Sequence, residues 1–118
     1  MNRRIVPDTD HVSRYCKPIF CTEQYRPTGA AFELRPKERF LSVNWLEFLN
    51  LQTREKEITE KRRILGSKFR KLPASGRIAV LNVGDTRSHV SNNTPDQRML
   101  DILHEPEVND PSHSGIYG

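Results

Sequence analysis

The chain has 118 residues, of which 35% are hydrophobic and 29% are charged, and its net charge is +4. A chain of this length supports one domain with one modest core. No apolar run approaches the roughly 20 residues that cross a bilayer. The Arg3-Arg4 pair is followed by only Ile5 and Val6 before Pro7, so we expect neither a membrane span nor a secretory signal.

The cysteine content is typical of a cytoplasmic protein. Cys16 and Cys21 are the only cysteines, and without a visible export signal we expect free thiols, because disulfides persist mainly in oxidising compartments. Their spacing, with His104 and His113 as the only distant partners, does not match that of structural zinc sites. We therefore expect a cytoplasmic protein without a metal or another cofactor.

The N-terminal third predicts a loose arm followed by short strands. Residues 1–10 are polar and interrupted by a proline, which is typical of an arm. Residues 11–16 (HVSRYC) alternate in polarity and predict a strand. Residues 30–34 and 40–43 are short apolar segments separated by a proline-containing turn, so they predict a β-hairpin.

The strongest local pattern is a helix start at Asn44. Its side chain can accept a hydrogen bond from the Glu47 amide, and the Glu47 carboxylate can return to the Asn44 amide. Val43 and Phe48 can form the matching hydrophobic staple. We therefore predict that a helix begins directly after Asn44, and that it either continues as one long helix or has a kink at residues 51–53.

The second half of the chain predicts a central strand followed by mostly irregular structure. Residues 77–83 (RIAVLNV) are apolar on both faces, as expected for a buried central strand. Residues 85–97 are polar and predict a loop. Residues 98–104 are compatible with a strand or a helical turn, of which we favour the strand, and residues 105–118 predict an extended tail.

These elements predict one α+β domain over residues 11–104, with a loose arm at 1–10 and a C-terminal tail at 105–118. Its small, mainly antiparallel sheet would pack against one long or kinked helix. The predicted centre of the core consists of Phe32, Leu34, Leu41, Trp45, Phe48, Val80 and Leu81.

The clearest functional pattern is the basic segment, residues 61–71. It contains six basic residues and no acidic one, so the rest of the chain carries a net charge of −2. Such a run can bind nucleic acid or an acidic protein surface, and it can equally be a solvated helix end. An aromatic side chain within the run can stack on a base. The predicted anion-binding residues are Lys61, Arg62, Arg63, Lys68, Phe69, Arg70 and Lys71.

A second hypothesis is a small metal-independent nuclease or phosphotransferase. His11 and Arg14 lie in the first predicted strand, and His113 lies near the C-terminus. Two histidines can act as acid and base, and an arginine can stabilise the charge of a pentavalent phosphate. The sequence does not show that the three residues meet, and a solvent-facing histidine is the simpler interpretation.

Five motifs carry a family resemblance. HVSRYC, AAFELRP, LSVNWLEF, IAVLNVG and NDPSHSGI occur in this order between His11 and Ile116. Together they resemble a family of short uncharacterised bacterial proteins, some of which lie beside mobile-element or defence-type genes. The resemblance implies a free-standing bacterial protein and assigns no activity or site residue. We therefore favour a small accessory protein that binds an anionic partner over an enzyme, with its oligomeric state left open.

Overall fold

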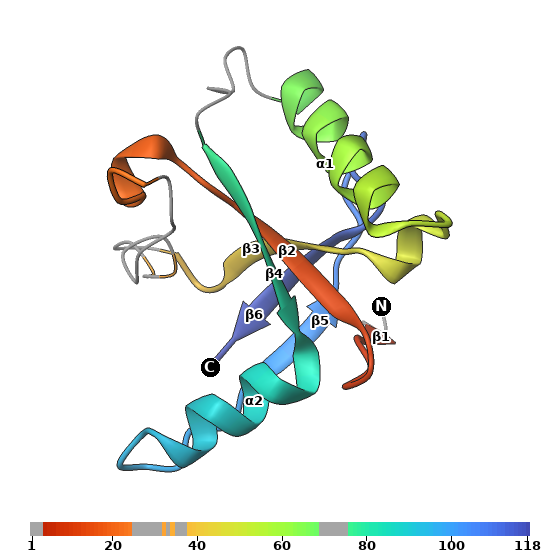
Figure 1. Ribbon diagram of the computed structural model, residues 1–118. Helices are drawn as coiled ribbons and strands as arrows, with labels where there is room; N and C mark the ends of the chain where they lie inside the picture. Colours follow the sequence, from red (N-terminus) through yellow and green to blue (C-terminus); the bar gives the residue numbers. More distant parts are fainter. Residues whose placement is uncertain (1–3, 25–31, 33, 35–37, 69–75) are drawn as a thin grey trace.

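The structure is a computed structural model that describes residues 4–24, 32, 34, 38–68 and 76–118. These residues form an α+β fold with one six-stranded antiparallel sheet and two α-helices (Figure 1). The predicted α+β class and the antiparallel sheet are confirmed. The prediction of one long or kinked helix is not, because the two helices are separate. Neither described helix has the length and apolar character needed to cross a bilayer.

The strands pair in the order β1-β5-β6-β3-β2-β4. Their bounds are Arg4–Ile5 for β1, His11–Cys16 for β2, Leu41–Trp45 for β3, Arg77–Asn82 for β4, Asp101–His104 for β5 and His113–Tyr117 for β6. The helices are α1, Arg54–Lys68, and α2, Val83–Asn92, and two short 3-10 turns are η1, Pro18–Phe20, and η3, Glu47–Leu49. Of the hairpin predicted from strands at 30–34 and 40–43, the first strand lies largely outside the described residues, and the second overlaps β3.

The C-terminal segment forms an inner strand of the sheet rather than the predicted tail. β6 pairs with β5 on one side and with β3 on the other. Its sequence, HSGIY, contains few strong β-formers, so its pairing partners rather than local preference place it in the sheet. β1 also pairs with β5, so part of the predicted loose arm belongs to the same sheet.

The predicted helix start at Asn44 is wrong, because Asn44 lies in β3 between β2 and β6. Its side-chain amide donates hydrogen bonds to Asp110 and Ser112 and does not cap a helix. α1 begins only after residues 51–53, the position at which a kink was the alternative prediction. Pairing on both sides of β3 therefore outweighs the local capping pattern.

The prediction of a loop at 85–97 is wrong for residues 85–92, because these residues belong to α2. Asn82 caps the helix by accepting a hydrogen bond of 2.9 Å from the Asp85 amide. Val83 is buried and Val90 packs against the core, whereas most other residues of α2 are polar. This sparse apolar stripe explains why hydrophobic periodicity does not reveal the helix.

One face of the sheet carries the hydrophobic core. Paired residues share a face, and successive residues of a strand point to opposite faces. Val12 pairs with Trp45 on one neighbouring strand and with Leu81 on the other, so these three side chains share a face. We call it the apolar face, and the core residues on and around it are Val6, Val12, Val43, Trp45, Val83, Leu100, Ile102 and Ile116.

The predicted core is partly confirmed. Trp45 belongs to the core, and Leu41, Phe48 and Leu81 are partly buried against it. The other two aliphatic members are exposed, by 48% for Leu34 and 39% for Val80, so their prediction as core is wrong. Val80 lies on β4, which is an edge strand rather than the central strand expected from its apolar composition.

The opposite face of the sheet is polar and is covered by α1. Ser13 pairs with Asn44, and Asn44 pairs with His113, so these three residues share that face. We call it the polar face. α1 (upper right in Figure 1) turns an unusual set of side chains inward, two charged and two aliphatic. The buried residues of α1 are Glu57, Lys61, Ile64 and Leu65.

Candidate functional site

The described part of the basic segment, residues 61–68, is engaged in contacts within the molecule. Lys61 is buried and donates a hydrogen bond to the Ser13 carbonyl. The Lys68 ammonium lies 2.9 Å from a Glu107 carboxylate oxygen and 2.8 Å from one of Asp110. Burial lowers the pKa of Lys68, but the hydrogen bonds to these two carboxylates outweigh burial and raise it above its ordinary value.

The other described cations of the segment also have partners. Arg63 forms an ion pair with Glu60 one turn earlier in α1, and Arg62 donates to the Gly76 carbonyl at 3.3 Å. The other three predicted anion-binding residues lie outside the described residues; they are Phe69, Arg70 and Lys71. Anion binding through the basic segment therefore stays a prediction.

His11 forms a fixed pair with Glu47. One carboxylate oxygen lies 2.7 Å from the His11 Nδ1, and the other accepts the His11 backbone N–H at 2.7 Å. Burial raises the pKa of Glu47, but the hydrogen bonds from His11 outweigh burial and bring it below its ordinary value. Because a carboxylate can only accept a hydrogen bond, the ionised Glu47 side chain holds the His11 ring through Nδ1.

Arg14 and His113 meet at a different residue, Ser42. Arg14 donates to the Ser42 carbonyl at 2.8 Å, and the His113 Nε2 lies 3.3 Å from the Ser42 hydroxyl. The His113 Nδ1 donates to the Glu105 carbonyl at 2.9 Å. Strand spacing puts the Cα atoms of His11 and His113 roughly 12 Å apart. The structure thus joins two of the three predicted catalytic residues and leaves His11 apart, and phosphoryl transfer stays a prediction.

A cluster of buried polar side chains lies between the polar face and α1. The Asn44 amide donates to Asp110 at 2.7 Å and to the Ser112 hydroxyl at 2.9 Å, and Lys68 binds the other Asp110 oxygen. Asp110 is 1% exposed and Ser112 is fully buried. We call these four residues the Asp110 cluster. It fixes the loop before β6 to both β3 and α1.

Next to this cluster, Lys61 and Ser13 have fewer hydrogen-bond partners than their polar groups could use. Lys61 is 2% exposed, and the Ser13 carbonyl is its one hydrogen-bond acceptor among the described residues. The Ser13 hydroxyl is buried and has no partner in that part of the chain. Burial lowers the pKa of Lys61 well below its ordinary value; the Asp110 carboxylate opposes this shift and Arg14 adds to it.

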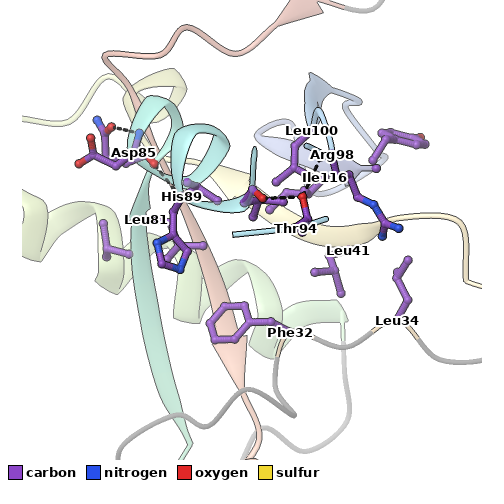
Figure 2. A pocket seen from close by; sticks show the side chains of 16 residues that line it. Phe32, Leu34, Leu41, Leu81, Asp85, His89, Thr94, Arg98, Leu100 and Ile116 are labelled. Atoms are coloured by element: carbon purple, nitrogen blue, oxygen red, sulfur yellow. Dashed lines mark hydrogen bonds between the residues drawn. The ribbon is translucent and has the colours of Figure 1, made fainter. Parts of the chain in front are cut away.

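The apolar face carries a cavity of about 900 Å³ beside α2 (Figure 2). The aliphatic residues that line it are Leu41 of β3, Leu81 of β4, Leu100 directly before β5 and Ile116 of β6. Phe32 also lines the cavity, and in Figure 2 its ring lies across the opening from α2. The wall is thus mainly hydrophobic and is contributed by several separate segments.

Polar side chains lie around the edge of this cavity. Asp85 and His89 come from α2, and Thr94 and Arg98 come from the segment between α2 and β5. In Figure 2, Asp85 and Arg98 lie at opposite ends of the cavity. The Thr94 hydroxyl donates to the Val90 carbonyl and accepts from the Arg98 amide, both at 2.8 Å, so this end of the edge is fixed in position.

Neither the Asp110 cluster nor the cavity is predicted by the sequence. Asn44 was interpreted as a helix cap, and Asp110 and Ser112 were assigned to a tail. The segment HSGIY gives no usable signal, because its two short residues, Ser114 and Gly115, are adjacent and Ile116 is its one aliphatic residue. The cavity residues are spread over the chain and have no common motif.

The chain matches no known protein family, no curated protein and no solved structure.

Proposed function

We propose that this protein binds a small amphipathic molecule, with an apolar body and an anionic group, in the cavity beside α2. The observation that carries the proposal is the cavity of about 900 Å³ with its hydrophobic wall and few polar side chains. Sites for small molecules typically measure roughly 300–1,000 Å³ and have this composition. The proposal keeps the expected non-enzymatic binding of an anionic partner but locates it at α2 instead of the basic segment.

The hydrophobic wall supports an apolar ligand body. Leu41 and Ile116 are directly paired on adjacent strands, and Ile116 pairs with Ile102 on the next strand. Leu100 and Ile116 belong to the core and are only 9% and 7% exposed, so they form a firm floor. An apolar ligand on this floor would remove hydrocarbon surface from water at about 25 cal/mol per Å².

The charges at the edge support an anionic group at one end. The Arg98 side chain is 55% exposed, and its ion pair with Asp96 is 3.5 Å long and also exposed. An exposed pair of this kind contributes only about 0–1 kcal/mol, so a ligand carboxylate can replace it at little cost. Asp85 at the other end disfavours an anion there, which fixes the orientation of the ligand.

Isothermal titration calorimetry with dodecanoate, below its critical micelle concentration, tests the proposal. We expect dodecanoate to bind and dodecylammonium, which has the same chain length, to bind more weakly. Arg98→Glu should weaken dodecanoate binding about tenfold, because it replaces an attraction by a repulsion. The matched control Arg63→Glu reverses an exposed charge on α1 and should leave the affinity unchanged.

Two results would reject the proposal. One is the absence of dodecanoate binding to a folded protein. The other is equal affinity for the two amphiphiles combined with equal loss in the Arg98→Glu and Arg63→Glu variants, which would indicate general attraction by net charge. A Val90→Trp variant adds a separate check, because a bulky ring in the cavity wall should abolish binding while far-ultraviolet circular dichroism stays unchanged.

A further inference from the structure

We propose that the protein forms a dimer in which β4 of one copy pairs antiparallel with β4 of a second copy. The proposal does not depend on the ligand proposed for the cavity beside α2. β4 is the last strand at one edge of the sheet, with β2 as its neighbour on the inner side (Figure 1). Pairing of the two β4 strands joins the sheets of both copies into one continuous sheet.

The β4 backbone presents hydrogen-bonding groups at this edge. The amide of Val83, directly after β4, donates to the carbonyl of Asp10, directly before β2, at 2.9 Å. Because alternate residues of an antiparallel strand bond to the same neighbour, the odd-numbered residues of β4 bond to β2. Ile78 and Val80 therefore direct their N–H and C=O groups outward, and among the described residues these four groups have no partner.

Contacts within the molecule occupy the outward carbonyls on either side of this pair of residues. The Asn82 carbonyl accepts a hydrogen bond of 2.8 Å from the Thr86 hydroxyl. The Gly76 carbonyl accepts one of 3.3 Å from Arg62. The edge that is left open is therefore short.

The open part of β4 lacks the usual protection of an edge strand. Proteins protect sheet edges with charged side chains, prolines or bulges, or by making the edge strand very short. β1, at the other edge, has two residues. β4 has six, and residues 78–81 among them contain neither a charge nor a proline. Val80 is 39% exposed, so the edge is open to a further strand.

A two-fold axis at Ala79 makes this edge complementary to itself. It places Ile78 of each copy opposite Val80 of the other, and each of these two pairs exchanges two hydrogen bonds. All the outward groups of Ile78 and Val80 in both copies then have partners. Ala79 lies opposite its own counterpart in a pair without hydrogen bonds, where the Cα atoms approach to about 4.5 Å and a small side chain fits.

The charges of the strand allow two identical copies to face each other. In this register Arg77 of each copy lies opposite Leu81 of the other, four residues along the strand from the second Arg77. Four residues of extended strand span about 13 Å, a distance at which exposed charges are largely screened at physiological salt. Ile78 and Val80 are both β-branched, and such side chains pack well across neighbouring strands. A second copy therefore meets the edge with matched hydrogen bonds and without charge repulsion.

Analytical ultracentrifugation of the full chain tests for the dimer. We expect a change from monomer to dimer between about 10 µM and about 1 mM protein, the range of a weak association. Val80→Lys puts a charge on the edge and should raise the dimer dissociation constant at least about tenfold, with unchanged circular dichroism. The matched control Val108→Lys makes the same change at an 88% exposed valine outside the strands and should leave this constant unchanged.

Hydrogen exchange measured by nuclear magnetic resonance identifies the paired edge. The Ile78 and Val80 amides should exchange at least about fivefold more slowly at about 1 mM than at about 50 µM protein. The Ala79 amide faces β2, so its exchange should not depend on concentration. A protein that stays monomeric over this range, unchanged exchange at Ile78 and Val80, or equal weakening of the dimer by both lysine variants would overturn the proposal.

Discussion

The two faces of the sheet are buried by different kinds of interaction. The apolar face is buried by hydrophobic contacts, to which α2 contributes Val83 and Val90. The polar face meets α1 through Lys61 and the Asp110 cluster. Hydrophobic contact is non-directional and leaves room for a cavity of about 900 Å³. Polar burial requires a partner for each donor and acceptor. Ligand binding and sensitivity to single substitutions should therefore occur on opposite faces of the sheet.

The largest expected effect on stability is that of Asp110→Ala. This change removes one of the two acceptors of the Asn44 amide and one of the two carboxylates that bind the Lys68 ammonium, in a site where Asp110 is 1% exposed. Breaking one partner of a buried charge pair typically costs about 3 kcal/mol or more. Urea unfolding should therefore show a loss of about 3 kcal/mol. The control Asp96→Ala removes an exposed carboxylate and should change the free energy of unfolding by less than about 0.5 kcal/mol; similar losses in both variants would contradict the polar-face description.

A smaller effect, with the opposite sign, is expected for Lys61→Met. Methionine has a similar length and needs no hydrogen-bond partner, and apolar replacements of buried charges are often neutral or stabilising. At pH 7 the variant should be at least as stable as the unmodified protein within about 1 kcal/mol. A loss above about 2 kcal/mol would show that the amine of Lys61 holds α1 in place.

The same pair of proteins gives a pH dependence with a defined sign. The pKa of Lys61 in the folded protein is lower than its ordinary value of 10.5, so between these two values the unfolded chain binds more protons than the folded one. The Lys61 contribution to the free energy of unfolding therefore rises with pH in this window. Urea unfolding at pH 7 and pH 10 should show that the advantage of Lys61→Met shrinks at the higher pH. An advantage that grows with pH would contradict the lowered pKa.

The smallest expected effect concerns α2, which forms one wall of the cavity. Asn82→Ala removes the side chain that accepts a hydrogen bond of 2.9 Å from the Asp85 amide. Loss of such a cap typically costs about 1 kcal/mol. Thermal unfolding should show this loss, whereas Ser88→Ala, an exposed substitution within α2, should leave stability unchanged or slightly higher. No difference between the two variants would argue against the cap.

The sequence predicts the strands that local composition indicates. It misses the strands that depend on pairing with segments distant in the chain. β2 and β4 were predicted at nearly their observed bounds, because alternation and apolar composition are local properties. β6 and the strand position of Asn44 depend on pairing with neighbours on both sides, which no local pattern reveals. The capping pattern at Asn44 was convincing and still wrong.

The sequence identifies single residues of the candidate sites but not the contacts that bring them together. Lys61 was identified as a basic residue, but its burial follows from the docking of α1 against β2, a contact between residues far apart in sequence. Asp110 and Ser112 gain their role only because β6 lies inside the sheet. The cavity has no motif, because Leu41, Leu81 and Ile116 converge through strand order alone.

Nuclear magnetic resonance mapping of dodecanoate on the folded protein tests the division between the two faces most directly. Titration of the isotopically labelled protein should shift the backbone amide signals of Leu81, Val90 and Ile116, which line the cavity. The signals of Ser13 and Lys61 on the polar face should stay unchanged. Shifts centred on Ser13 and Lys61, with none at the cavity, would contradict the assignment of ligand binding to the apolar face.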